Sequence, residues 1–109
     1  MRTRHVIGVA AAAVALAAGL AAGAQRAATH TVIMEAVGFQ PPSLTVNAGD
    51  TVVWTNKDPF PHTATAQDKS FDSGEIAAGK SWKLVAKKKG TFAYVCTYHP
   101  TMKATLVVR

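Results

Sequence analysis

The chain has a single cysteine, Cys96, among 109 residues. Structural zinc sites usually need four cysteine and histidine ligands and rarely include methionine, so a zinc site is a poor match. The sequence has no internal repeat, and no low-complexity stretch follows residue 24. A chain this short offers little room for a cleft with an oxyanion-binding corner, which disfavours a cysteine–histidine enzyme.

Acidic residues are also scarce, with six against twelve lysines and arginines. The basic residues are not interleaved with aromatic ones as in nucleic-acid-binding modules, so we expect no nucleic-acid partner. Lys87, Lys88 and Lys89 are consecutive, with Lys80 and Lys83 nearby. Two interpretations stay open for this run: a solvated hairpin end that protects a sheet edge, or a docking patch for an acidic partner protein.

The first 24 residues have the pattern of an export signal. Arg2 and Arg4 precede an uncharged stretch over 6–24, which ends in the small residues Ala-Gly-Ala. No adjacent arginine pair supports a twin-arginine signal, and no cysteine follows for lipoprotein attachment. We therefore predict a signal peptide at 1–24, a single mature domain at 25–109 and a periplasmic location. Retention of the stretch as an anchor is the alternative, and we expect no membrane contact without it.

The mature domain is predicted to be an all-β, Greek-key antiparallel sandwich. Seven short strand-like runs with turn signals between them support this class; they span residues 31–36, 43–46, 51–55, 63–66, 81–86, 91–96 and 104–108. Period-two alternation places Val52 and Trp54 in the core. It also places Phe92, Tyr94 and Cys96 on one inward face, which puts the thiol at the end of a core strand.

Cys96 begins the run Cys-Thr-Tyr-His-Pro-Thr-Met, which brings a thiolate, the imidazole of His99 and the thioether of Met102 into one tight loop. A second imidazole, His62, follows a proline-rich turn far upstream. Two histidines and a cysteine with a weak axial methionine are the ligands of blue-copper centres. Soft sulfur suits Cu(I) and imidazole suits Cu(II), so this mixed set predicts a copper site. Metal ligation would also occupy a thiol that is otherwise unpaired in an oxidising compartment.

His30 is expected to be an exposed polar residue. If cleavage instead followed Ala27, a free amine with histidine in the third position would be a second Cu(II) site. Gln25 and Ala27 fit the cleavage rule poorly.

The chain resembles the small cupredoxins of the plastocyanin and azurin class, and amicyanin above all. The residues that carry the resemblance lie at 39–46, 49–56, 61–63, 71–74, 90–92 and 96–102. The two residues between His99 and Met102 resemble the short amicyanin loop. The resemblance implies that His62, Cys96 and His99 are equatorial copper ligands and that Met102 is the axial one.

The resemblance further implies a monomeric one-electron carrier without enzymatic activity. A periplasmic dehydrogenase would be its donor and a c-type cytochrome its acceptor, with electrons passing through an exposed His99 edge inside a patch of apolar loops. Copper buffering or delivery on the same fold is the alternative function. Two positions depart from the family pattern. Thr63 replaces an asparagine that ties the ligand loops together, and Ala104 replaces a frequent glycine, so the last strand was expected to begin differently.

Overall fold

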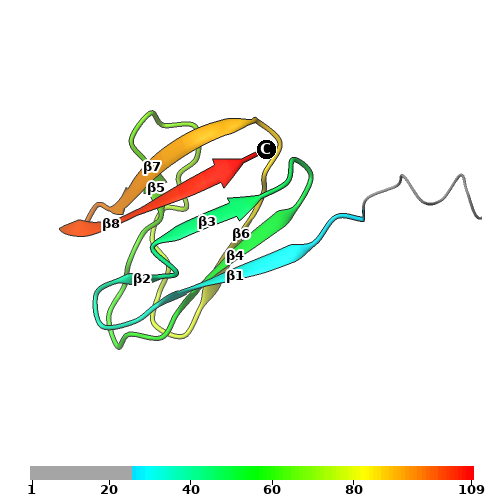
Figure 1. Cartoon of the computed structure of the whole chain (residues 1–109). Helices are drawn as coiled ribbons and strands as arrows, with labels where there is room; N and C mark the ends of the chain where they lie inside the picture. Colours follow the sequence, from blue (N-terminus) through cyan, green and yellow to red (C-terminus); the bar gives the residue numbers. More distant parts are fainter. Residues whose placement is uncertain (1–25) are drawn as a thin grey trace, which may run out of the picture.

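The computed structural model describes residues 26–109 and forms two packed sheets (Figure 1). The predicted signal peptide lies outside the described residues. The described residues form eight strands, namely β1 (Thr29–Met34), β2 (Phe39–Gln40), β3 (Ser43–Val46), β4 (Thr51–Asn56), β5 (Thr65–Ala66), β6 (Ser81–Val85), β7 (Gly90–Cys96) and β8 (His99–Val108). Within 26–109, no helix has the length and apolar character to cross a bilayer.

The strand order is β2-β1-β4-β6 in one sheet and β3-β8-β7-β5 in the other. This confirms the predicted all-β sandwich, although the sheets are not purely antiparallel. Strand β1 pairs with β4 in parallel, and β3 pairs with β8 in parallel. The chain crosses from one sheet to the other at Pro41 and Pro42, so β4 returns beside β1 in the same direction. Local sequence patterns do not reveal such a crossover.

Most strand boundaries lie within two residues of the prediction, and the largest differences concern β2 and the start of β8. Strand β3 has the predicted limits, whereas β2 was not predicted because it has only two residues. Strand β8 begins at His99, five residues before the predicted start at Ala104. Ala104 is buried within this strand, so alanine is accommodated there as ordinary sheet backbone.

The side chains that were predicted to face the core are buried. Val52 and Trp54 are fully buried, as are Tyr94 and Cys96, and Phe92 is nearly so. The buried hydrophobic side chains of the described chain all lie between residues 32 and 108. A domain that starts at residue 25 therefore contains the whole of this core and is expected to fold without the preceding segment.

The sandwich has two ends of different character. At one end, β7 finishes at Cys96 and β8 begins at His99; at the other, β7 begins at Gly90 and β8 finishes beside it. Seven residues of extended chain separate these ends by roughly 20 Å. The lysine run 87–89 connects β6 to β7, which belong to different sheets. The prediction of a hairpin end was therefore wrong, because the run makes a crossing between the sheets.

His30 lies at the end away from Cys96, and its predicted exposure was wrong. Its Nε2 lies 2.9 Å from Asp50 Oδ2, and its side chain is only 27% exposed. The Asp50 carboxylate also accepts hydrogen bonds from the backbone N–H groups of Ala28 and Asn47. The bond from Ala28 lowers the pKa of Asp50 most, followed by those from His30 and Asn47, and together they bring it to about 2. Asp50 thereby fastens the start of β1 to the turn that precedes β4.

We expect Asp50→Asn to lower the melting temperature at neutral pH. The further decrease of the melting temperature in acid should be smaller in the variant than in the wild type. The folded-state pKa of about 2 lies below the ordinary value of 3.8. The ionised carboxylate therefore contributes stability in full above about pH 4 and loses it as the pH falls toward 2. Thermal melts of the 25–109 domain from pH 7 to pH 2 test this, with the exposed Glu35→Gln as control. An Asp50→Asn variant with the wild-type pH slope would contradict it.

Candidate metal centre

Three potential metal ligands meet at one end of the sandwich. Cys96 is the last residue of β7 and His99 the first of β8, so a two-residue turn holds them together. His62 comes from the connection between β4 and β5, where its backbone pairs with Ile76 in an isolated bridge. The three ligands thus come from two sequence-distant segments that the packed sheets bring together.

The side chains converge through one atom each. The Sγ atom of Cys96 lies 3.6 Å from Nδ1 of His62 and 3.7 Å from Nδ1 of His99. All three potential ligand atoms lie within 4.8 Å of one another. His62 and Cys96 are fully buried, whereas His99 is partly exposed. Both imidazoles turn Nδ1 toward the sulfur, so one metal ion could bind the two nitrogens and the sulfur together.

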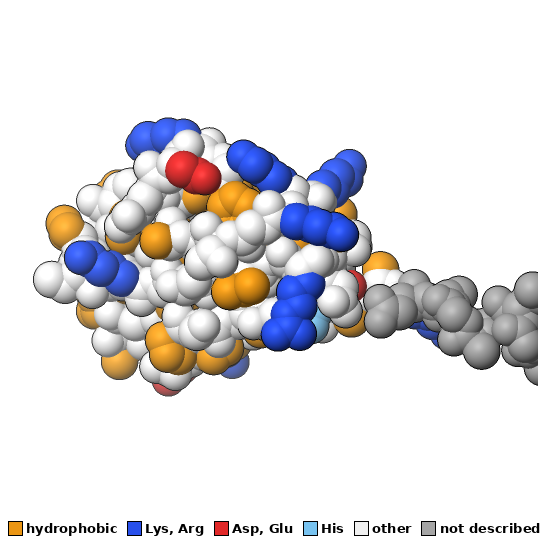
Figure 2. Space-filling model, turned by 45° about the horizontal axis from the view of Figure 1, so that its top comes forward, with side chains coloured by type: hydrophobic (Ala, Val, Ile, Leu, Met, Phe, Trp, Pro, Cys, Tyr) orange, Lys and Arg blue, Asp and Glu red, His pale blue; other side chains and the backbone are white. Residues whose placement is uncertain are grey.

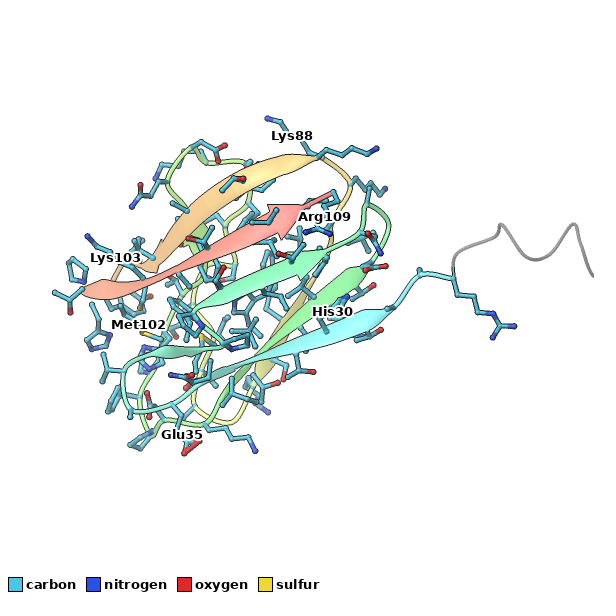
Figure 3. The ribbon with its side chains drawn as sticks, viewed as in Figure 1. His30, Glu35, Lys88, Met102, Lys103 and Arg109 are labelled. Carbon is cyan, nitrogen blue, oxygen red and sulfur yellow. The ribbon has the colours of Figure 1, made fainter. Side chains whose placement is uncertain are left out.

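Met102, the fourth predicted ligand, is 2% exposed and belongs to β8. The β7–β8 ladder passes from the pair Val95–Lys103 directly to Cys96–His99, so residues 100–102 lie in its irregular part. Figure 3 shows Met102 at the same end of the sandwich as these residues. Met102 continues the alternation that buries residues 104, 106 and 108 of β8, so its side chain faces the interior of the sandwich.

The donor set fits copper better than other common metals. One thiolate, two imidazoles and a buried thioether combine ligands for Cu(I) and Cu(II), whereas Mg²⁺ and Ca²⁺ require oxygen donors. The backbone N–H of Thr63 donates a hydrogen bond to Cys96 Sγ over 3.3 Å. Hydrogen bonds to this sulfur help to set the redox potential of blue-copper sites.

Asp58 orients His62, a contact that the sequence analysis did not predict. Its Oδ2 lies 2.7 Å from Nε2 of His62, which leaves Nδ1 to face the sulfur. The same carboxylate accepts hydrogen bonds from the N–H groups of Ala36 and Val37, two non-glycine residues with positive φ. Burial raises the pKa of Asp58, but the bonds from His62 and the two backbone groups outweigh it and leave the pKa lowered.

Asp58→Asn is expected to weaken copper binding about 10- to 100-fold, the usual cost of losing a partner behind a metal-bound histidine. Competition against a calibrated Cu(I) chelator measures the affinity. Asp68→Asn, a substitution of an exposed carboxylate that bonds to Ser70 in its own turn, serves as the control. Unchanged affinity in Asp58→Asn would show that packing alone holds the His62 ring.

Thr63 ties the two ligand segments together, although it replaces the asparagine that the resemblance led us to expect. Its Oγ1 accepts a hydrogen bond of 2.9 Å from the backbone N–H of Thr97. It also lies 3.2 Å from the Thr97 hydroxyl and 3.0 Å from that of Thr65. The link between the loops is therefore kept, and a hydroxyl serves in place of an amide.

Replacing Thr63 by valine should lower the free energy of unfolding of the copper-free domain by about 1 kcal/mol, because the N–H of Thr97 loses its acceptor without a change in side-chain shape. Thr63→Ser keeps the hydroxyl and should lose less. Urea denaturation of both variants measures the difference. A valine variant at least as stable as the serine variant would mean that the tie contributes nothing.

Aromatic and proline side chains surround the exposed edge of His99. The ring of Phe60 lies 5.7 Å from that of His99 and 5.3 Å from that of His62, and Phe60 is 38% exposed. Four further residues within three positions of His62 or His99 in the sequence are also exposed, namely Pro59, Pro61, Pro100 and Thr101. The site therefore reaches solvent through His99 inside an apolar rim.

Comparison with known proteins gives a consistent result. The profile of the family described as cupredoxin-like domain matches residues 8–108. Amicyanin-alpha of Methylorubrum extorquens is 31% identical over 101 residues, which cover 86% of this chain and 85% of that protein. The structure of a reduced amicyanin mutant superposes with a TM-score of 0.68 at 28% identity, over 74% of this chain and 82% of that one.

A copper enzyme is also among the structural neighbours. A copper-containing nitrite reductase from Thermus scotoductus SA-01 superposes with a TM-score of 0.70 at 28% identity. The match covers 74% of this chain but only 22% of the reductase. The likeness concerns one sandwich of a much larger protein.

Proposed function

This chain belongs to the family of cupredoxin-like domains, and we propose that it is a type 1 blue-copper electron carrier. The resemblance seen in the sequence is thus confirmed at the level of the family. We assign His62, Cys96 and His99 as the equatorial ligands of one copper ion and Met102 as the axial ligand. The observation that carries this assignment is the convergence of two Nδ1 atoms on one buried sulfur.

Bound copper would supply a one-electron couple between Cu(II) and Cu(I). The protein contributes a ligand set that tolerates both oxidation states and is held by strand ends and hydrogen bonds rather than by a long loop. Little ligand movement is then needed when an electron enters or leaves. Because four protein side chains fill the proposed coordination shell, no position is left for a substrate, which supports a carrier rather than an enzyme.

The partly exposed edge of His99 is the proposed route for electrons. His62 and Cys96 are fully buried, so His99 is the equatorial ligand that a partner could approach. The apolar rim with Phe60 would exclude water from the contact. Donor and acceptor are proposed to be larger redox proteins, a dehydrogenase and a c-type cytochrome.

We further propose that residues 1–24 are a signal peptide, that 25–109 is the mature domain and that it works in the periplasm as a monomer. Mass spectrometry of the protein recovered from the periplasmic fraction tests the cleavage site directly. A mass that begins at Gln25 is expected. A mass that includes residues 6–24 would mean that the segment is retained as an anchor.

Voltammetry and copper transfer separate an electron carrier from a copper-handling protein. A carrier should give a reversible one-electron wave and fast self-exchange, and should keep its copper in the presence of a copper-free acceptor protein. An irreversible wave together with ready loss of Cu(I) to the acceptor would reject electron transfer as the function.

A further inference from the structure

The net positive charge of the described domain is concentrated at the end of the sandwich away from the metal centre. Hydrogen bonds bring the C-terminus and two turns together there: Ala48 N–H bonds to the carbonyl of Arg109, and Gly49 N–H to that of Ala86. Five basic residues belong to this end, which we call the basic end: Arg26, Lys87, Lys88, Lys89 and Arg109. All five are exposed.

Elsewhere in the described chain, the basic and acidic residues are equal in number. The half around the metal centre has three basic and three acidic residues, namely Lys57, Lys80, Lys103, Glu35, Asp58 and Glu75. Lys83 and Asp72 balance each other, as do the adjacent Asp68 and Lys69, of which Asp68 lies within the electrostatic reach of Lys88. Apart from that pair, the one acidic residue at the basic end of the described chain is Asp50, which is buried and engaged in hydrogen bonds. Figure 2 shows lysine and arginine side chains gathered where the described chain begins.

Protection of a sheet edge does not explain the lysine run. Strand β6 is the edge strand of its sheet and ends at Val85, so residues 87–89 follow it rather than lie on it. Lys83, within β6, is already placed to protect that edge. Exposed acidic groups near the run are limited to Asp68, whose pKa is lowered by Ser70 and to a lesser degree by Lys88. The run therefore remains largely available for an external anion.

Apolar surface accompanies these charges. A hollow of about 180 Å³ opens between the two sheets beside the run, and Lys87 and Lys88 border it. Its remaining lining includes the apolar side chains of Leu84, Phe92 and Val108. Val85, which also lines it, is 48% exposed. Cations around exposed apolar groups are the combination that favours binding at the interface of a membrane.

The place where the chain enters the domain also indicates that a membrane contacts the basic end. Arg26 is the first described residue, so the uncharged stretch 6–24 joins the domain at the basic end. Whether that stretch is a signal or an anchor, it places this end toward the bilayer when the domain is delivered. The metal centre lies at the other end, roughly 20 Å along β7.

We propose that the basic end is a docking surface for an anionic lipid bilayer, which holds the domain with its metal centre facing away from the membrane. Lipid phosphates pair with the lysines and arginines, and the hollow with Val85 contacts the apolar boundary. This revises the expectation of no membrane contact without an anchor. The apolar rim around His99 then stays free for redox partners. The lipid contact itself does not depend on the proposed electron transfer.

Vesicle sedimentation tests the proposal with the copper-loaded 25–109 domain. Vesicles of phosphatidylcholine alone are compared with vesicles that also contain phosphatidylglycerol, at low and at physiological ionic strength. We expect binding only to the anionic vesicles, and weaker binding at physiological than at low ionic strength. The triple variant Lys87→Gln, Lys88→Gln and Lys89→Gln should bind about a hundredfold more weakly, since each lysine near such a surface contributes about a factor of five.

The matched control also removes three positive charges, but from the half of the domain around the metal centre. Lys57→Gln, Lys80→Gln and Lys103→Gln together should bind anionic vesicles as the wild type does. Equal losses in both triple variants would show that net charge alone matters and would overturn the proposal. Absence of binding to anionic vesicles at low salt would also overturn it and favour an acidic protein as the partner. The visible copper band of each variant reports separately whether the metal site is intact.

A separate measurement tests how the domain is oriented on the membrane. A hydrophilic, soluble reductant should reduce vesicle-bound and free protein at the same rate, because the proposed surface leaves His99 in solvent. Strong slowing on vesicles would show that the metal end faces the lipid and would reject the orientation.

Discussion

Cys96→Ser is expected to remove the intense visible absorption of the copper-loaded protein. The thiolate of Cys96 is the one soft anionic ligand that the chain offers, and its Sγ is the atom on which both imidazoles converge. A serine hydroxyl at the same place is a hard, neutral donor, so it supplies no comparable charge-transfer transition and binds Cu(I) poorly. We expect the band to fall by at least tenfold.

Absorption spectra of the purified variant after Cu(II) addition provide the measurement. Tyr98→Phe is the matched control, because Tyr98 lies in the same turn but its hydroxyl contacts Glu75, away from the cluster. The control should keep the band. Intense colour in Cys96→Ser would mean that the sulfur is not a ligand, and the assignment of all four positions would fail with it.

Trp54→Ala is expected to give the largest loss of stability among single core substitutions, about 3–5 kcal/mol. Trp54 is fully buried in β4, between the two sheets. Its ring lies 5.4 Å from that of Trp82, 5.7 Å from that of Phe71 and 5.6 Å from that of Tyr94. Truncation leaves a cavity that these large neighbours cannot close without losing contacts with one another.

Trp82→Ala is the matched comparison, since Trp82 pairs with Trp54 across β4 and β6 but remains partly exposed. Truncation of Trp82 should lower the free energy of unfolding clearly less than truncation of Trp54 does. Denaturant unfolding of the copper-free domain measures both, which keeps metal binding out of the comparison. A Trp54 variant no less stable than the Trp82 variant would show that the core is not centred on β4.

The parts of the fold that could be predicted from the sequence are those set by local alternation. Val52 and Trp54 occupy alternate positions on β4, and Phe92, Tyr94 and Cys96 alternate positions on β7, so their burial followed from a period of two. The parallel pairing of β1 with β4 could not be predicted in this way, because it depends on where the chain crosses between sheets. Strand β2 was too short to show any period.

The metal cluster was predictable because unusual residue types coincide in one short loop. Its supporting contacts were not. Asp58 comes four residues before His62, but nothing in that spacing shows that its carboxylate meets Nε2. Thr63 departs from the family pattern, and the sequence did not show that its hydroxyl would keep the link between the loops through Thr97. His30 was expected to be exposed because it lies near the predicted start of the mature domain, and its partner, Asp50, is too distant in the sequence to be foreseen.

The most direct test of the central claim is the visible spectrum of the 25–109 domain during Cu(II) addition and a subsequent reductant titration. Charge transfer from thiolate to copper reports the bond of Cys96 itself. We predict an intense band in the visible that saturates at one equivalent of copper, bleaches on reduction and returns on reoxidation. A colourless protein, or one that holds Cu(I) and cannot be reoxidised, would contradict a blue-copper electron carrier.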